Sequence, residues 1–373
     1  MAQRTGDTIH PGLNRIESLF SNQYERFTQT EESGLDVTVV DTVKDIGKTE
    51  WNGIVERSSR GSVFHRYEWL EAIEEGLGYT PRHLVITKDG NKIGGMPNFV
   101  VEIEKTPFKR LSTLYPGFGG PLVPTDTSES LTQLTEAVPN LCGGTTIVHQ
   151  IRGLDTSYLR YNDLLQSQGY RPFRRECRFL VDLTKGHDEI LADMSRTRRR
   201  GIERGRDGDY DIVETEITPA NLRRFYRTYE RVMNRVGGDA YPFSFFDQLR
   251  AMDSHLLFLT IQIDGEYAGG MLEVLDDQRD SIHGFFAAVP RAYFDDHASE
   301  LLYDYVFRWG IENGYETYDF GSTNADFEDG VYRFKEGFGG RAEPVLIWER
   351  GCSPLWKLIK AGRSLYWPHY TGS

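Results

Sequence analysis

The chain has 373 residues, of which 39% are hydrophobic and 13% aromatic, and this composition excludes a wholly disordered protein. Its net charge of −13 argues against a general polyanion-binding protein, so we expect no DNA binding. The three cysteines show no metal-ligand spacing and are odd in number, which supports neither a disulfide framework nor a zinc site. We expect no bound metal.

The N-terminal residues 1–34 are polar and lack the apolar core of a signal peptide, and no later window reaches the length of a membrane span. We therefore expect a flexible leader and a cytoplasmic protein. A strand is predicted over 35–40, and an aromatic segment follows at 64–73. Next, Asp89-Gly joins an apolar run at 84–87 to another at 93–101, which is typical of a hairpin. Residues 177–183 have the character of a closing strand.

The second half of the chain repeats this pattern. The segment from Asp89 to Met96, with Gly-Gly before the methionine, returns 175 positions later as Asp264 to Met271. At the same offset, 35–40 corresponds to 210–215, and 64–73 and 169–183 are answered by 241–249 and 337–349. A period this long indicates two copies of one globular domain rather than a solenoid.

We therefore predict domains over 35–183 and 209–350, each an α/β (α+β) unit with a mixed central sheet flanked by helices. The connector, 184–208, has a helical pattern and carries six arginines. It is either a solvated helix face or a patch that contacts the phosphates of a nucleotide-linked substrate or tRNA. The tail, 351–373, is basic and aromatic, and as a helix it would either pack on the second domain or rest on the inner face of the membrane.

The second copy contains two short sequence motifs in succession, Tyr318-Asp-Phe-Gly-Ser322 and Tyr332-Arg-Phe-Lys-Glu-Gly-Phe-Gly339. Together with the duplicated hairpin, they resemble the Fem-type (FemAB-like) peptidyltransferases and their relatives in the GNAT acyltransferase superfamily. The likeness covers about 35–350. It implies two tandem GNAT-like domains, an acceptor site between them, and chemistry concentrated in the second.

Four residues are candidates for catalysis. The resemblance implies that Lys335 stabilises charge developing on an acyl carbonyl, whereas the alternative is a surface lysine in a glycine-containing loop. Asp319 could orient the amine or accept its proton, or it could cap a turn. Glu273 and His283 are candidate general bases, although buried or surface hydrogen-bonding roles are as common for such residues.

Candidate substrate-binding residues come from both copies. The resemblance places Arg235 on a phosphate or carboxylate of the acceptor, while a cation facing a helix C-terminus is the alternative. The loop 114–121 supplies Tyr115, Gly119 and Gly120, where glycines let a ligand approach the backbone. Phe334, beside Lys335, completes the motif, and the connector adds Arg198 and Arg199 as phosphate contacts.

The sequence does not identify the acyl donor, because a pyrophosphate-binding motif is missing. The segment 287–298 lacks the (Gln/Arg)-x-x-Gly-x-(Gly/Ala) turn with which coenzyme-A-dependent GNAT enzymes hold pyrophosphate. We therefore expect an N-acyltransferase that acts on a primary amine of an envelope glycan, peptide precursor or amino sugar, nucleotide- or lipid-linked. The donor substrate would be acyl-CoA or aminoacyl-tRNA, with no permanently bound cofactor. The alternatives are an aminoacyl-tRNA-dependent peptidyltransferase of Fem type and a catalytically degenerate binding scaffold.

Overall fold

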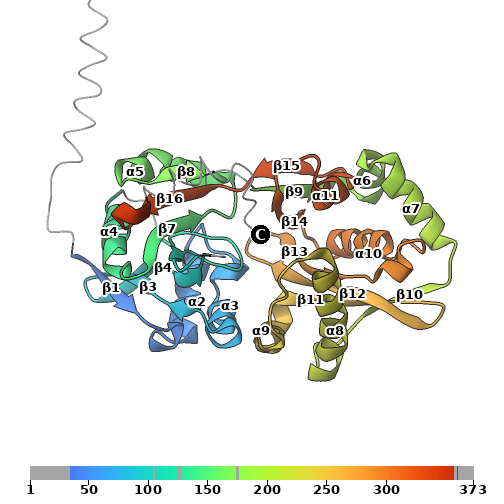
Figure 1. Ribbon diagram of the computed structural model, residues 1–373, viewed down its shortest axis with the longest axis horizontal. Coiled ribbons are helices and arrows are strands. Elements are labelled where there is room, and N and C mark those ends of the chain that lie inside the picture. Colours follow the sequence, from blue (N-terminus) through green and yellow to red (C-terminus); the bar gives the residue numbers. More distant parts are fainter. Residues whose placement is uncertain (1–33, 104–105, 124–127, 174–175, 357–358, 360–373) are drawn as a thin grey trace, which may run out of the picture.

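A computed structural model describes residues 34–103, 106–123, 128–173, 176–356 and 359 (Figure 1). The expected leader and most of the expected tail lie outside these residues. The chain forms two α/β halves side by side, and each half has helices on both sides of its strands. No helix in the described part of the chain is long and apolar enough to cross a membrane.

The first half contains two sheets. The smaller has the order β1-β3-β4, and the larger has the order β2-β5-β6-β7-β16-β8. These strands are β1 (Leu35–Val40), β2 (Thr80–Pro81), β3 (His83–Lys88), β4 (Asn91–Met96), β5 (Phe99–Glu102), β6 (Lys109–Ser112), β7 (Thr146–Arg152), β8 (Arg171–Phe173) and β16 (Ile347–Gly351). The α-helices packed around them are α2 (Lys48–Arg57), α3 (Tyr67–Glu71), α4 (Ser128–Ala137) and α5 (Asn162–Ser167).

The second half is built on one seven-stranded sheet of order β10-β11-β12-β13-β14-β9-β15. Its strands are β9 (Glu176–Asp182), β10 (Tyr210–Glu214), β11 (Leu256–Ile263), β12 (Glu266–Asp276), β13 (Ser281–Ala288), β14 (Thr317–Asn324) and β15 (Arg341–Pro344). Its α-helices are α6 (His187–Asp193), α7 (Arg196–Arg206), α8 (Pro219–Val236), α9 (Phe243–Leu249), α10 (Ala298–Glu312) and α11 (Gly330–Glu336).

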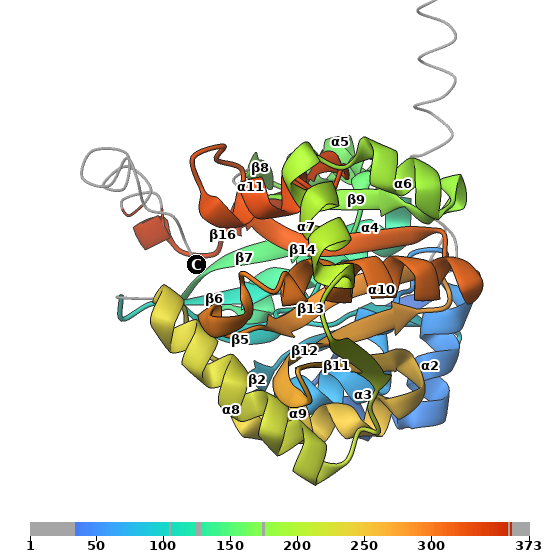
Figure 2. The same cartoon turned by 90° about the vertical axis from the view of Figure 1, so that its right-hand side faces the viewer.

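Alternate residues of the central strands face opposite sides of this sheet, and different helices cover the two faces (Figure 2). Phe258 and Leu272 belong to the apolar cluster that contains α8, whereas Leu257 and Met271 belong to the cluster that contains α10. In α8, the Thr218 side chain caps the first turn, and Gly237 ends the helix in the left-handed conformation at φ 72°.

The predicted hairpins are both present and have the same geometry. Asp89 and Gly90 have φ of 50° and 80°, and Asp264 and Gly265 have φ of 51° and 78°, as a type I′ turn requires. The strand pairing shifts register after Ile86 in the first hairpin and after Ile261 in the second, again 175 positions apart. These equivalent irregularities support duplication of one structural unit.

The last strand of each sequence copy lies in the sheet that the other copy mainly forms. Strand β9 is inserted between β14 and β15 of the second half, and β16 lies between β7 and β8 of the first. The predicted ranges 35–183 and 209–350 therefore do not coincide with the two large sheets. The last strand of each range belongs to the sheet of the other range. The sequence of an apolar strand does not indicate which of two sheets it joins.

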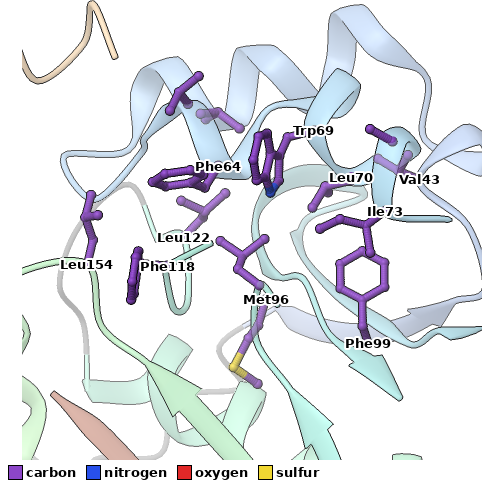
Figure 3. Packing of buried hydrophobic residues seen from close by; sticks show 14 of the residues in the cluster. Val43, Phe64, Trp69, Leu70, Ile73, Met96, Phe99, Phe118, Leu122 and Leu154 are labelled. Atoms are coloured by element: carbon purple, nitrogen blue, oxygen red, sulfur yellow. The ribbon is translucent and has the colours of Figure 1, made fainter. Parts of the chain in front are cut away.

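An aromatic cluster also joins the halves. Phe64 and Trp69, from the first half, lie in the core shown in Figure 3, and their ring centroids are 5.9 and 5.0 Å from that of Phe285 on β13. Trp69 also packs against Phe245 of α9 at 5.8 Å. The two halves thus share buried apolar surface as well as strands.

Two further expectations need correction. The connector is two helices rather than one, because Met194 is extended and the Ser195 side chain caps α7. Cys142 and Cys352 form a disulfide across 210 positions, whereas the number and spacing of the cysteines predicted none. The fold brings together two cysteines whose spacing carries no signal.

Candidate functional site

The candidate site lies where β13 and β14 part. These strands pair in parallel only from Ser281↔Thr317 to His283↔Asp319, although both continue further. Beyond that point β13 stays paired with β12, and β14 pairs with β9. The side chains of His283 and Asp319 therefore mark the end of the parallel pairing, a position at which α/β sheets commonly form sites.

A buried charge network occupies this point. The Asp319 carboxylate accepts hydrogen bonds from Arg178 Nη1 at 2.5 Å and from the Gly321 backbone N–H at 2.9 Å. His283 Nδ1 lies 3.1 Å from the same carboxylate, and Nε2 lies 3.7 Å from Asp276. All four side chains are almost completely buried, which makes loss of any partner costly.

This network limits which groups can act as a base. Burial alone would raise the pKa of Asp319, but Arg178 and His283 outweigh it and hold that pKa well below its usual value. Burial alone would lower the pKa of His283, but Asp276 and Asp319 outweigh it and raise that pKa. Asp319 and His283 each favour the charged form of the other, so we assign them an orienting and electrostatic role rather than proton abstraction.

Glu273 is buried in the core rather than exposed at the site. Burial raises its pKa to about 8, which keeps it protonated at neutral pH, and its carboxyl oxygen lies 3.1 Å from the Tyr318 hydroxyl. Gly284 makes room for this pair, since a Cβ there would lie 2.5 Å from the hydroxyl. The geometry thus favours a structural polar pair over the predicted general base.

Lys335 lies on α11, not in the loop that the sequence suggested. Its Nζ donates hydrogen bonds to the backbone oxygens of Gly321 at 3.2 Å and Ser322 at 3.0 Å. The pairing of β14 with β9 shifts register between Asp319 and Ser322, and Gly321 has φ 69°, a conformation that glycine allows. Burial lowers the pKa of Lys335 to about 8. The Tyr-Asp-Phe-Gly and Phe-Lys motifs are therefore in contact at the irregularity in β14, through Lys335 and the backbone of Gly321 and Ser322.

Sequence reasoning missed three charged residues beside this irregularity. Arg178 and Glu176 are on β9, and Arg152, at the end of β7, donates a hydrogen bond from Nη2 to Glu176 at 3.0 Å. Arg152 also lies 5.6 Å from the ring centre of Tyr115. The available signal was an arginine in an otherwise apolar strand, such as Arg178 in Cys177-Arg-Phe-Leu-Val.

The loop of the first half contributes differently from the prediction. Tyr115 is half-buried beside Arg152, as a substrate-facing residue could be. Gly119 and Gly120, in contrast, face the interior: a Cβ would lie 2.3 Å from Leu114 and 2.7 Å from Tyr158, respectively. We attribute these glycines to close internal packing rather than to approach of a ligand.

The other predicted arginines are dispersed. Arg235 lies at the end of α8, with its guanidinium 5.3 Å from the Phe294 ring. Arg198 forms an ion pair with Glu300 of α10 and lies 4.1 Å from the ring of Phe334, while Arg199 Nη1 donates to backbone oxygens of α6. Much of the expected phosphate patch is thus committed to contacts within the second half.

Comparisons with known proteins agree with this architecture. Residues 192–336 match the family model described as an acetyltransferase (GNAT) domain. Among solved structures, the chain is similar to FemX, with 14% identity, a TM-score of 0.67, and coverage of 87% of this chain and 100% of that one. Comparison with curated protein sequences gave no match.

Two further solved structures have the same arrangement. One is the C-terminal domain of a putative lysylphosphatidylglycerol synthetase from Agrobacterium fabrum, with 15% identity, a TM-score of 0.54, and coverage of 85% and 94%. The other is a tandem GNAT protein from the clavulanic acid biosynthesis pathway, with 12% identity, a TM-score of 0.51, and coverage of 86% and 99%.

The chain thus has a Fem-like tandem GNAT fold, and its residues 192–336, which include α7 to α11, form an acetyltransferase (GNAT) domain.

Proposed function

We propose that the protein transfers an acyl group to a primary amine of a cell-envelope glycan, a peptide precursor or an amino sugar. The observation that carries this proposal is the cation of Lys335, held at the irregularity in β14 where the parallel strands part. A fixed positive charge there would stabilise negative charge developing on the acyl oxygen.

The reaction needs little more from the protein. The neutral amine attacks the acyl carbon, a C–N bond forms, and the C–S or C–O bond to the donor breaks. The proton lost by the amine passes to the departing group or to water. Since neither Asp319 nor Glu273 is an effective base, positioning and charge stabilisation are the main contributions of the protein.

Two observations favour aminoacyl-tRNA over acyl-CoA as donor. The exposed Asp295 and Asp296 lie just before the N-terminus of α10, where they would repel a pyrophosphate. In the same half, Arg224, Arg227 and Arg231 of α8 line a groove of about 500 Å³ together with Thr228, Glu230 and Tyr267. Exposed arginines in such a row are suited to the phosphates of a nucleic acid. We further propose a cytoplasmic location, because both donors are made there.

The test is product formation by the purified protein with each donor. Acetyl-CoA and a mixture of aminoacyl-tRNAs are offered separately with amino sugars and with peptides that have a free amine, and new amides are detected by mass spectrometry. We expect amide formation with at least one donor. If tRNA is the donor, binding should weaken steeply with salt and fall in the Arg224→Gln/Arg227→Gln/Arg231→Gln variant. Absence of amide with every pair would count against the proposed function.

A further inference from the structure

Two arginines of the first half lie against the same aromatic ring. The guanidinium carbon of Arg110 is 4.7 Å from the ring centre of Tyr115, and that of Arg152 is 5.6 Å from it. The two guanidinium groups are therefore within about 10 Å of each other. Arginine stacked on a ring keeps its in-plane N–H groups available for oxyanions.

Positive charge is in excess at this cluster. Arg152 pairs with Glu176, and the neighbouring Arg178 pairs with Asp319. Arg110 is half-buried, and it forms no ion pair with any residue that the structure describes. The Nε atoms of Arg110 and Arg152 are both buried without a hydrogen-bond partner. Like charges held this close are unfavourable, so a further anion would stabilise the cluster.

Tyrosines surround the two arginines. Tyr79, Tyr115 and Tyr241 are each partly exposed, and Tyr241 packs against Phe286 of β13 with 6.0 Å between ring centroids. Burial, and then the nearby Tyr115 and Tyr79, raise the pKa of Tyr241, so its hydroxyl stays neutral and can donate a hydrogen bond. The surroundings thus offer neutral donors, and the acids that act on the cluster are Glu176, which is paired with Arg152, and Glu102, which lies near Tyr79.

The cluster adjoins the candidate catalytic centre. Glu176, the partner of Arg152, pairs in register with Asn324 on β14, and Lys335 binds the backbone oxygen of Ser322 on the same strand. We propose that Arg110 and Arg152 bind an oxyanion of the acceptor, a phosphate or a carboxylate, and so place its amine near Lys335. This inference rests on the proposed acyl transfer and makes the acceptor an anionic amine.

The inference can be tested by binding alone. Glucosamine, glucosamine 6-phosphate and muramic acid share an amine and a sugar ring, but only the last two carry an oxyanion. By isothermal titration calorimetry, we expect the full-length protein to bind at least one anionic sugar tenfold or more tightly than glucosamine. The phosphate and carboxylate arms distinguish the two sources of the anion.

The Arg110→Gln variant should lose this preference, with Kd for the anionic sugar rising about tenfold, as for loss of one charge-assisted contact. Arg57→Gln, at an exposed arginine at the end of α2, is the matched control and should keep it. Arg152→Gln should also weaken binding of the anionic sugar, but it leaves Glu176 without its partner and could prevent folding. Arg152→Lys keeps a positive charge beside Glu176 and loses the two parallel N–H groups of the guanidinium, so it should weaken binding in a folded protein. Circular dichroism verifies folding.

Equal affinity for all three sugars, no measurable binding of either anionic sugar, or an unchanged preference in folded Arg110→Gln would each overturn the inference. Failure of the proposed function gives a different result. In that case the anionic preference would be present, while no amide would form with any donor.

Discussion

Lys335 is the residue at which substitution should affect acyl transfer most directly. We expect Lys335→Met to lower kcat/KM by about 100-fold or more without unfolding the protein, as for removal of one group that stabilises the transition state. Lys185→Met is a suitable control, because Lys185 is an exposed lysine paired with Asp193 in the same half. Equal rates for Lys335→Met and the wild-type protein would return Lys335 to a purely structural role.

The pH dependence of the rate distinguishes a cation from a base at Lys335. Burial lowers its pKa to about 8, so the ammonium form is lost as pH rises through that value. If the ammonium is required, kcat/KM falls above about pH 8, and Lys335→Arg moves that fall to higher pH. A rate that rises through pH 8 in the wild-type protein but not in Lys335→Arg would instead indicate that the neutral form of Lys335 acts as a base.

Arg178 should matter for stability as well as for the site. Arg178→Leu leaves Asp319 buried with a weaker set of partners, so we expect a loss of about 3 kcal/mol in urea unfolding at pH 7. The loss should shrink as pH falls below the usual carboxyl range, because the depressed pKa of Asp319 contributes stability only while its carboxyl is ionised. Arg341→Gln, at an exposed arginine of β15, should cost about 0.5 kcal/mol or less.

These residues also show how far sequence could reach into the site. Short motifs and chemical type single out Lys335, Asp319 and His283 as candidates, and the structure brings them together around β14. Arg178 and Arg152 were not identified, because their partners come from distant parts of the chain. Long-range ion pairs leave no spacing in a sequence.

At the scale of a single element, Gly284 allows β13 to pass over the Tyr318 hydroxyl. Gly284→Ala should destabilise the protein by about 1–3 kcal/mol, since its Cβ would lie 2.5 Å from that hydroxyl. Tyr318→Phe in the same chain should recover part of the loss. Gly143→Ala, where nothing lies within 4 Å of the added Cβ, is the matched control, and an equal effect of both alanines would contradict this explanation.

Elements with strong local signals were predicted well. The two Asp-Gly turns depend on residues adjacent in sequence, and both are present. The helix α11, which carries Lys335, has only seven residues and lies in a glycine-rich stretch that suggested a loop. Asp329 caps this helix by accepting hydrogen bonds from the N–H groups of Val331 and Tyr332. An aspartate before a short run of helix-forming residues is the local signal that could have predicted the start of α11.

For the whole molecule, we expect one cooperative unfolding transition. The halves exchange β9 and β16 and share the aromatic cluster around Trp69, so neither retains a complete sheet or core when the other unfolds. Differential scanning calorimetry should give equal calorimetric and van't Hoff enthalpies. Two resolved transitions would show that the halves unfold independently despite the exchange.

The strand exchange also has a consequence for biosynthesis. A two-domain chain ordinarily begins to fold on the ribosome, with its N-terminal domain first. Here the larger sheet of the first half needs β16, residues 347–351, which are translated only after every strand of the second half. Until they emerge, β7 and β8 lack the strand that lies between them, and the nascent chain exposes unpaired strand edges of the kind on which chaperones act.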